Sequence, residues 1–108
     1  PFSEDHKVPG CESQAFVWAQ PEAPGTLQFH FAVENPQGLS AKAMAVVLDE
    51  TCSGAPVVEV AQISGDIVYR IFGSELSMGK TMGLMGLVAM VQNYAKRLLL
   101  ARTPADPR

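Results

Sequence analysis

A β-hairpin is predicted by residues 14–34, QAFVWAQPEAPGTLQFHFAVE. Its second half alternates in polarity, with Leu27, Phe29, Phe31 and Val33 on one face and Gln28, His30 and Ala32 on the other. This alternation is typical of a half-buried strand, and residues 14–19 are aromatic and β-branched, as strands often are. The intervening residues 20–25 (QPEAPG) contain two prolines and a glycine, which suit a loop. We therefore expect antiparallel strands at residues 14–19 and 26–34.

The rest of the chain shows helical spacing of its apolar residues. We expect a helix over residues 39–50, short helices over residues 56–62 and 66–72, and a long helix over residues 77–102. Pro56 suits the first position of one short helix, Gly73 suits the end of the other, and Ser77 suits the N-cap of the long one. Strands followed by helices indicate an α+β fold, in which helices cover one face of a small antiparallel sheet and the long C-terminal helix packs across the hairpin.

Length and composition limit the possible classes of protein. The chain has 108 residues, 47% of them hydrophobic, which predicts one globular core. Its net charge of −3 provides no excess of cations for a phosphate backbone, so we expect no nucleic-acid partner. Two cysteines are too few for a disulfide scaffold. No apolar run approaches the roughly 20 residues that a membrane-spanning helix needs.

The domain is expected to occupy residues 11–102. Residues 1–10 show no periodicity and are predicted to form an extended lead-in, and residues 103–108 a flexible tail. The chain opens at Pro1 without an initiator methionine, a basic start or an apolar signal segment, which indicates a processed or excised piece.

Two apparent functional motifs do not have the residue spacing that their chemistry requires. The segment GSELSMGKT, residues 73–81, has one residue too many between its glycines for a phosphate-binding loop. Cys11, Cys52, His6 and His30 are scattered and form no zinc-binding pattern. We therefore expect no metal site and no bound cofactor.

Cys11 is the strongest candidate for chemistry. It follows Pro9 and Gly10 at the junction of a loop with the first strand, where another molecule can reach a side chain. Nearby His6 and Lys7 favour a thiolate, while the adjacent glutamate opposes it. By residue type alone, both a reactive and a buried structural Cys11 stay open.

Cys52, in contrast, is predicted to be a small, partly buried residue at the end of a helix. The last helix also contains four methionines and three glycines, which indicate either core packing or an adaptable surface for a partner: Met78, Met82, Met85, Met90, Gly79, Gly83 and Gly86.

Three segments together resemble one known family. Residues 6–18, HKVPGCESQAFVW, are similar to the active-site segment of SufE proteins, N-(K/R)-V-x-G-C-x-S-Q-V-W. Residues 52–56, CSGAP, resemble the family's L-S-G-x-x-P-E-x-V stretch, and residues 76–84, LSMGKTMGL, resemble its L-T-P-S-R-x-x-G-L. The resemblance extends over residues 6–100.

The resemblance implies a fold shared with iron–sulfur scaffold proteins of the IscU type, and a function. SufE proteins accept sulfur from cysteine desulfurases that carry pyridoxal phosphate (PLP). Cys11 would then accept a persulfide and pass it to an iron–sulfur scaffold complex, as an accessory protein without a cofactor of its own. Gly10, Lys80, Lys42 and Arg70 would bind the partner or support the site.

The chain departs from the family pattern at several points. The family's first two helices are missing, and its acidic D-S-D segment is Asn35-Pro36-Gln37 here. Lys80 replaces an arginine, which keeps the charge and loses the bidentate fork, and Arg70 falls near a position where the family has glutamate.

These departures leave an alternative open: a SufE-fold interaction module in a larger assembly, which uses its methionine-rich helix and edge strand and transfers no sulfur. A third option is redox sensing by the same thiol. The resemblance implies the plastid stroma if the source is a plant or alga, and otherwise the cytoplasm.

Overall fold

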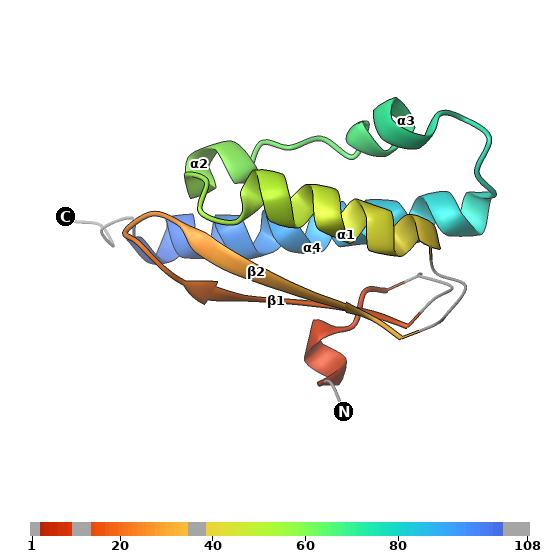
Figure 1. Ribbon diagram of the computed structural model, residues 1–108. Helices are drawn as coiled ribbons and strands as arrows, with labels where there is room; N and C mark the ends of the chain where they lie inside the picture. The colour runs from red at the N-terminus through yellow and green to blue at the C-terminus, as the bar shows by residue number, and fades with distance from the viewer. Residues whose placement is uncertain (1–2, 10–13, 35–38, 103–108) are drawn as a thin grey trace.

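The computed structural model describes residues 3–9, 14–34 and 39–102 (Figure 1). The elements follow in the order η1 (Glu4–His6, a 3-10 turn), β1 (Ala15–Pro21), β2 (Leu27–Val33), α1 (Leu39–Cys52), α2 (Val57–Val60), α3 (Ile67–Phe72) and α4 (Met78–Arg102). The fold is α+β, as predicted.

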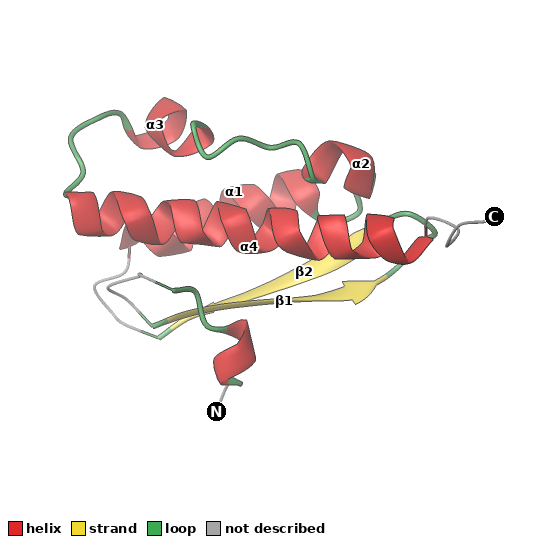
Figure 2. Cartoon of the chain, turned by 180° about the vertical axis from the view of Figure 1, so that it is seen from behind, coloured by secondary structure: helices red, strands yellow, loops and turns green. Residues whose placement is uncertain are grey.

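Helices cover one face of the two-stranded sheet. Helices α1 and α4 lie side by side on it, with α1 against β2 and α4 against β1 (Figure 2). Helices α2 and α3 run along the side of this helical pair that faces away from the sheet, as both views show (Figures 1 and 2). The predicted packing of the long last helix across the hairpin is therefore confirmed.

The hairpin is antiparallel and pairs Ala15 with Val33, Trp18 with His30 and Pro21 with Leu27. The expected loop at residues 20–25 is shifted, because β1 continues through Pro21. A proline is tolerated at the end of a strand, where the missing N–H costs no central hydrogen bond of a sheet.

The outer edge of β2 is covered at Leu27 and Phe29 by the segment that follows α1. The Gly54 amide donates to the Leu27 carbonyl at 2.9 Å, and the Phe29 amide donates to Ser53 Oγ at 2.9 Å. An isolated two-stranded sheet is marginal in water, so these bonds help to stabilise it and blunt its edge.

The outer edge of β1 is closed by two other segments. The Val8 amide donates to the Ala15 carbonyl at 2.7 Å, and the Tyr94 hydroxyl donates to the Val17 carbonyl at 3.1 Å. The N-terminal segment and α4 thus both attach to β1.

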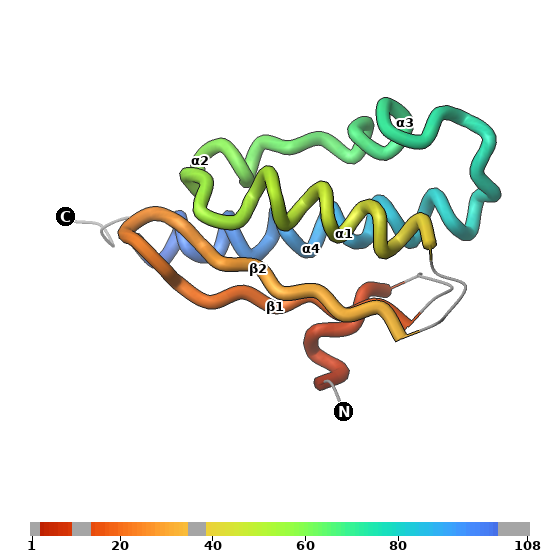
Figure 3. Tube along the Cα trace, viewed as in Figure 1, coloured from red at the N-terminus to blue at the C-terminus, as the bar shows by residue number. Residues whose placement is uncertain are grey.

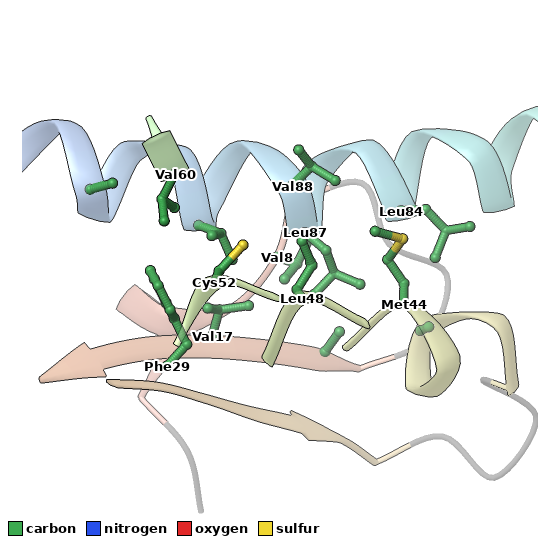
Figure 4. Close-up of a cluster of buried hydrophobic side chains, with 14 of the residues drawn as sticks. Val8, Val17, Phe29, Met44, Leu48, Cys52, Val60, Leu84, Leu87 and Val88 are labelled. Atoms are coloured by element: carbon green, nitrogen blue, oxygen red, sulfur yellow. The ribbon is translucent and has the colours of Figure 1, made fainter. Parts of the chain in front are cut away.

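The core lies between the sheet and the helices. Figure 4 shows several of its side chains, which come from β1, β2, α1, α2 and α4 and from the segment before β1. Its largest fully buried members are Val8, Val17, Phe29, Met44, Leu48, Val57, Val60, Val68, Leu84, Leu87, Val88 and Val91.

The predicted extended lead-in differs from the structure. Residues Glu4–His6 form a 3-10 turn, in which Ser3 Oγ accepts a hydrogen bond from the Asp5 amide at 3.2 Å. Val8 is only 1% exposed and belongs to the core. A single apolar residue has no periodicity, so its burial could not be predicted from local pattern.

The helices begin and end within two residues of the expected positions, although α1 continues to Cys52 and α2 already ends at Val60. The Lys80 amide donates to Ser77 Oγ at 3.2 Å, which confirms Ser77 as the N-cap of α4. Gly73 follows α3 with a φ of 74° and a ψ of −164°; the positive φ suits glycine, but the conformation is not the left-handed helical one. Pro56 lies one position earlier than expected, at the N-cap of α2. The predicted tail at residues 103–108 lies outside the described residues.

No helix within the described ranges has the length and apolar character needed to cross a membrane.

Candidate functional site

Cys11 and Gly10 lie outside the described residues, so the site is defined by what flanks them. On one side, Val8 is buried and its amide is bonded to the Ala15 carbonyl at 2.7 Å. On the other side, the Gln14 carbonyl accepts a hydrogen bond from the Glu34 amide at 2.8 Å. Both ends of the cysteine motif are therefore attached to the sheet.

Three stacked rings lie beside this attachment. The ring centroids of His6 and Trp18 are 5.8 Å apart, and those of Trp18 and His30 are 5.6 Å apart, with interplanar angles of 23° and 21°. His30 also lies 3.3 Å from Gln20 Oε1 through its Nε2 atom. His30 is thus half-buried and stacked on Trp18.

The stack also holds the turn before the cysteine motif. Because His6 belongs to η1 and Trp18 to β1, their contact fixes η1 against the sheet. Lys7 forms an isolated antiparallel bridge with Phe16 immediately after it. The sequence gives no signal for this stack beyond the polar-face position of His30.

The predicted supporting cations lie on three helices. Lys42 is in the first turn of α1, Lys80 is in the first turn of α4 and Arg70 is in α3, and all three side chains are exposed. The first turns of α1 and α4, together with α3, lie at the end of the molecule where β1 begins and β2 ends (Figure 3). The structure thus places the helix segments that carry these three cations at the same end of the molecule.

A groove of about 490 Å³ lies between the sheet and α1. Its lining combines aromatic rings with one cation and one carboxylate: Trp18, Gln28, Phe29, His30, Phe31, Val33, Lys42, Ala45, Val46 and Asp49. The carboxylate, that of Asp49, already has a hydrogen-bond partner, because its Oδ1 atom accepts a hydrogen bond from Ser53 Oγ at 2.7 Å. None of the described residues that line the groove is a cysteine.

Cys52 is more deeply buried than expected, at 1% exposure in the apolar core (Figure 4). Burial raises the pKa of its thiol, and the hydrogen bond with the Thr51 hydroxyl opposes that rise only in part. A thiol in this setting is protonated and inaccessible, and therefore a poor nucleophile.

Within the stretches that the structure describes, no group of three or more His, Cys, Asp or Glu side chains could hold a metal ion.

The family model "SufE: Fe-S metabolism associated domain" matches residues 2–95 of the 108 in the chain. A comparison with individually curated proteins finds no match. The fold and the cysteine motif thus belong to a domain associated with iron–sulfur metabolism. The chain is a member of the SufE family.

Proposed function

We propose that this protein accepts sulfur on Cys11 from a PLP-dependent cysteine desulfurase and delivers it to an iron–sulfur scaffold complex. The observation that carries the proposal is the position of Cys11 in the motif HKVPGCESQAFVW, inside the span that matches the SufE family. The anchored flanks of the motif support it, because a transfer between two proteins requires the acceptor to be presented in a defined direction.

The proposed step is an exchange at sulfur. The Cys11 thiolate attacks the outer sulfur of a persulfide on the desulfurase. A bond forms between Cys11 Sγ and that outer sulfur, while the bond from the outer sulfur to the donor cysteine breaks. The donor cysteine leaves as a thiolate and takes up the proton that Cys11 lost. No external oxidant or reductant is needed, because Cys11 is oxidised as the donor cysteine is reduced.

The other cysteine is a poor candidate for this role. The chain contains two cysteines, and burial both covers the Cys52 thiol and raises its pKa. Because the thiolate is the attacking species, Cys52 lacks both the charge state and the access that the exchange requires. This elimination favours Cys11 as the acceptor.

The exposed cations suggest how the donor docks. We assign Lys42, Lys80 and Arg70 to the partner-facing end, because their helices gather where β1 begins. Together with Gly10 of the motif, they would meet an acidic surface of the donor. Such charge complementarity mainly raises the rate of encounter, so its effect weakens with added salt.

The alternative role as an interaction module without sulfur transfer has less support at the sheet edges. The outward-facing groups at Leu27 and Phe29 are bonded to the segment after α1, and the carbonyls of Ala15 and Val17 are also occupied. A partner strand that pairs at these four residues would have to displace these bonds. Met78 and Met82, at 79% and 57% exposure, remain available to such a partner.

The test is an intact-mass measurement after incubation with a cysteine desulfurase, PLP and cysteine. Wild-type protein should gain sulfur, the Cys11→Ser variant should gain none, and the Cys52→Ala variant should behave as wild type. Alanine is the appropriate control at position 52, because serine would bury a hydroxyl in the apolar core. A wild-type protein that gains no sulfur would contradict the proposal and favour the interaction module.

A further inference from the structure

Helix α4 approaches the segment before Cys11 unusually closely at Gly86. A Cβ atom built on Gly86 would lie 2.8 Å from Val8 Cγ1 and 3.0 Å from the Pro9 carbonyl oxygen. Real Cβ atoms essentially never come as close as the first distance. Any side chain at position 86 would therefore push against residues that lie two and three positions before Cys11.

Val8 and Pro9 have little freedom to move away from a side chain at position 86. The Val8 side chain is 1% exposed within the core, and its amide is bonded to Ala15. The Pro9 contact is a backbone oxygen, which cannot rotate away as the end of a long side chain can. A side chain at position 86 therefore requires a shift of either α4 or the backbone just before Cys11.

We infer that Gly86 is a positioning residue for the Cys11 thiol. Because Gly86 has no side chain, α4 contacts Val8 and Pro9 directly. This contact fixes the position of the chain just before Cys11. The inference rests on the proposed sulfur transfer, which needs the thiolate aligned with a persulfide on a second protein. Alignment of reacting atoms is sensitive to shifts of about 1 Å, which can change a rate by about a hundredfold.

The helix itself gives no reason for glycine here. Glycine in the interior of a helix is less favourable than alanine, because it loses more backbone freedom on folding. Gly86 lies in the interior of α4. The close contact with Val8 and Pro9 supplies a reason that helix propensity does not.

The chain offers a matched control at Gly65. A Cβ atom there would lie 3.8 Å from Met85 Cγ, which is an ordinary van der Waals contact. Gly65→Ala therefore adds the same methyl group next to the same helix without a clash. Gly86→Ala and Gly65→Ala can be compared in one assay.

Persulfide formation on Cys11 should be followed by mass at saturating desulfurase. We expect Gly86→Ala to slow it by about tenfold and Gly65→Ala to leave it within about twofold. Labelling of Cys52 by iodoacetamide should stay slow in both variants, which would show that the core has not opened. A general loss of structure would instead expose Cys52, and the double variant Val8→Ala with Gly86→Ala then decides between the outcomes.

A second readout requires no desulfurase. Hydrogen exchange at the Val8 amide should be faster in Gly86→Ala, while exchange at the Glu34 amide, which is bonded on the far side of the motif, should not change. Unchanged exchange at Val8 would contradict the inferred displacement.

A double variant keeps the inference testable if Gly86→Ala alone does not fold. Val8→Ala removes the Cγ1 atom that clashes, so Val8→Ala with Gly86→Ala should accept sulfur faster than Gly86→Ala, or fold where it does not. If the double variant accepts sulfur no faster than Gly86→Ala and folds no better, the inference is overturned. Equal transfer by wild type and Gly86→Ala would overturn the inference alone, whereas a wild type that takes no sulfur would overturn the proposed function and the inference with it.

Discussion

The Phe29 amide donates a hydrogen bond to the Ser53 hydroxyl at 2.9 Å, which joins the middle of β2 to the turn that follows α1. The same hydroxyl donates to Asp49 Oδ1 at 2.7 Å, one turn earlier in the chain. Gln28 Nε2 adds a third bond to Ser53 Oγ at 3.3 Å. One serine of the CSGAP segment thus connects the sheet edge to the last turn of α1.

Ser53→Ala should destabilise the fold. The variant leaves the part-buried Phe29 amide without its hydrogen-bond partner and removes the shorter of the two hydrogen bonds to Asp49 Oδ1. We expect a loss of about 1–3 kcal/mol in the free energy of unfolding, measured by urea denaturation.

Ser74→Ala is the matched control, because Ser74 is exposed in the loop before α4. Ser74→Ala should lower the free energy of unfolding by less than about 0.5 kcal/mol. Equal effects of the two substitutions would show that the network around Ser53 adds nothing to stability.

The raised pKa of the Tyr94 hydroxyl predicts that the folded protein loses stability at high pH. Burial is the main cause that raises the pKa of its hydroxyl, with a further rise from Asp5 and an opposing effect of Arg97. The protonated form is therefore favoured in the folded state, and it donates to the Val17 carbonyl at 3.1 Å. This contribution is complete below the unfolded pKa of about 10 and is lost as the pH rises through the higher folded value.

The comparison of wild type with Tyr94→Phe isolates this effect, since all other titrating groups are common to both. Wild type should be more stable by about 0.5–1.5 kcal/mol near neutral pH. The difference should shrink as the pH is raised above about 10. A difference that stays constant or grows with pH would contradict the assignment.

Much of the fold follows from local pattern. The alternation from Leu27 to Val33 predicts β2, and Ser77 and Gly73 mark helix ends where the structure has them. These signals are local, because side-chain period and capping chemistry depend on near neighbours in the chain.

The remaining features depend on contacts between distant residues. Val8 is buried because it pairs with Ala15 and meets Gly86, and Ser53 matters because β2 passes beside it. Of the candidate site, the sequence supplies Cys11, Lys42, Lys80 and Arg70, but it gives no sign that the chain is held against α4 just before Cys11.

The two cysteines should differ sharply in reactivity. At about pH 8, iodoacetamide should modify Cys11 readily and Cys52 at least about a hundredfold more slowly, because Cys52 reacts only when the core opens. In urea both should react. Peptide mapping after timed quenching gives the two rates separately. Rapid native labelling that persists in Cys11→Ser would contradict the assignment of Cys52 to the core.

The most direct measurement follows a labelled sulfur atom from donor to acceptor. A cysteine desulfurase is loaded with radiolabelled persulfide, freed of excess cysteine and mixed with the protein, and the peptides are then separated. The label should move to the peptide that contains Cys11 and remain on the desulfurase when Cys11→Ser is the acceptor. Label that stays on the desulfurase with wild-type protein, or that reaches Cys11→Ser equally well, would contradict sulfur transfer to Cys11.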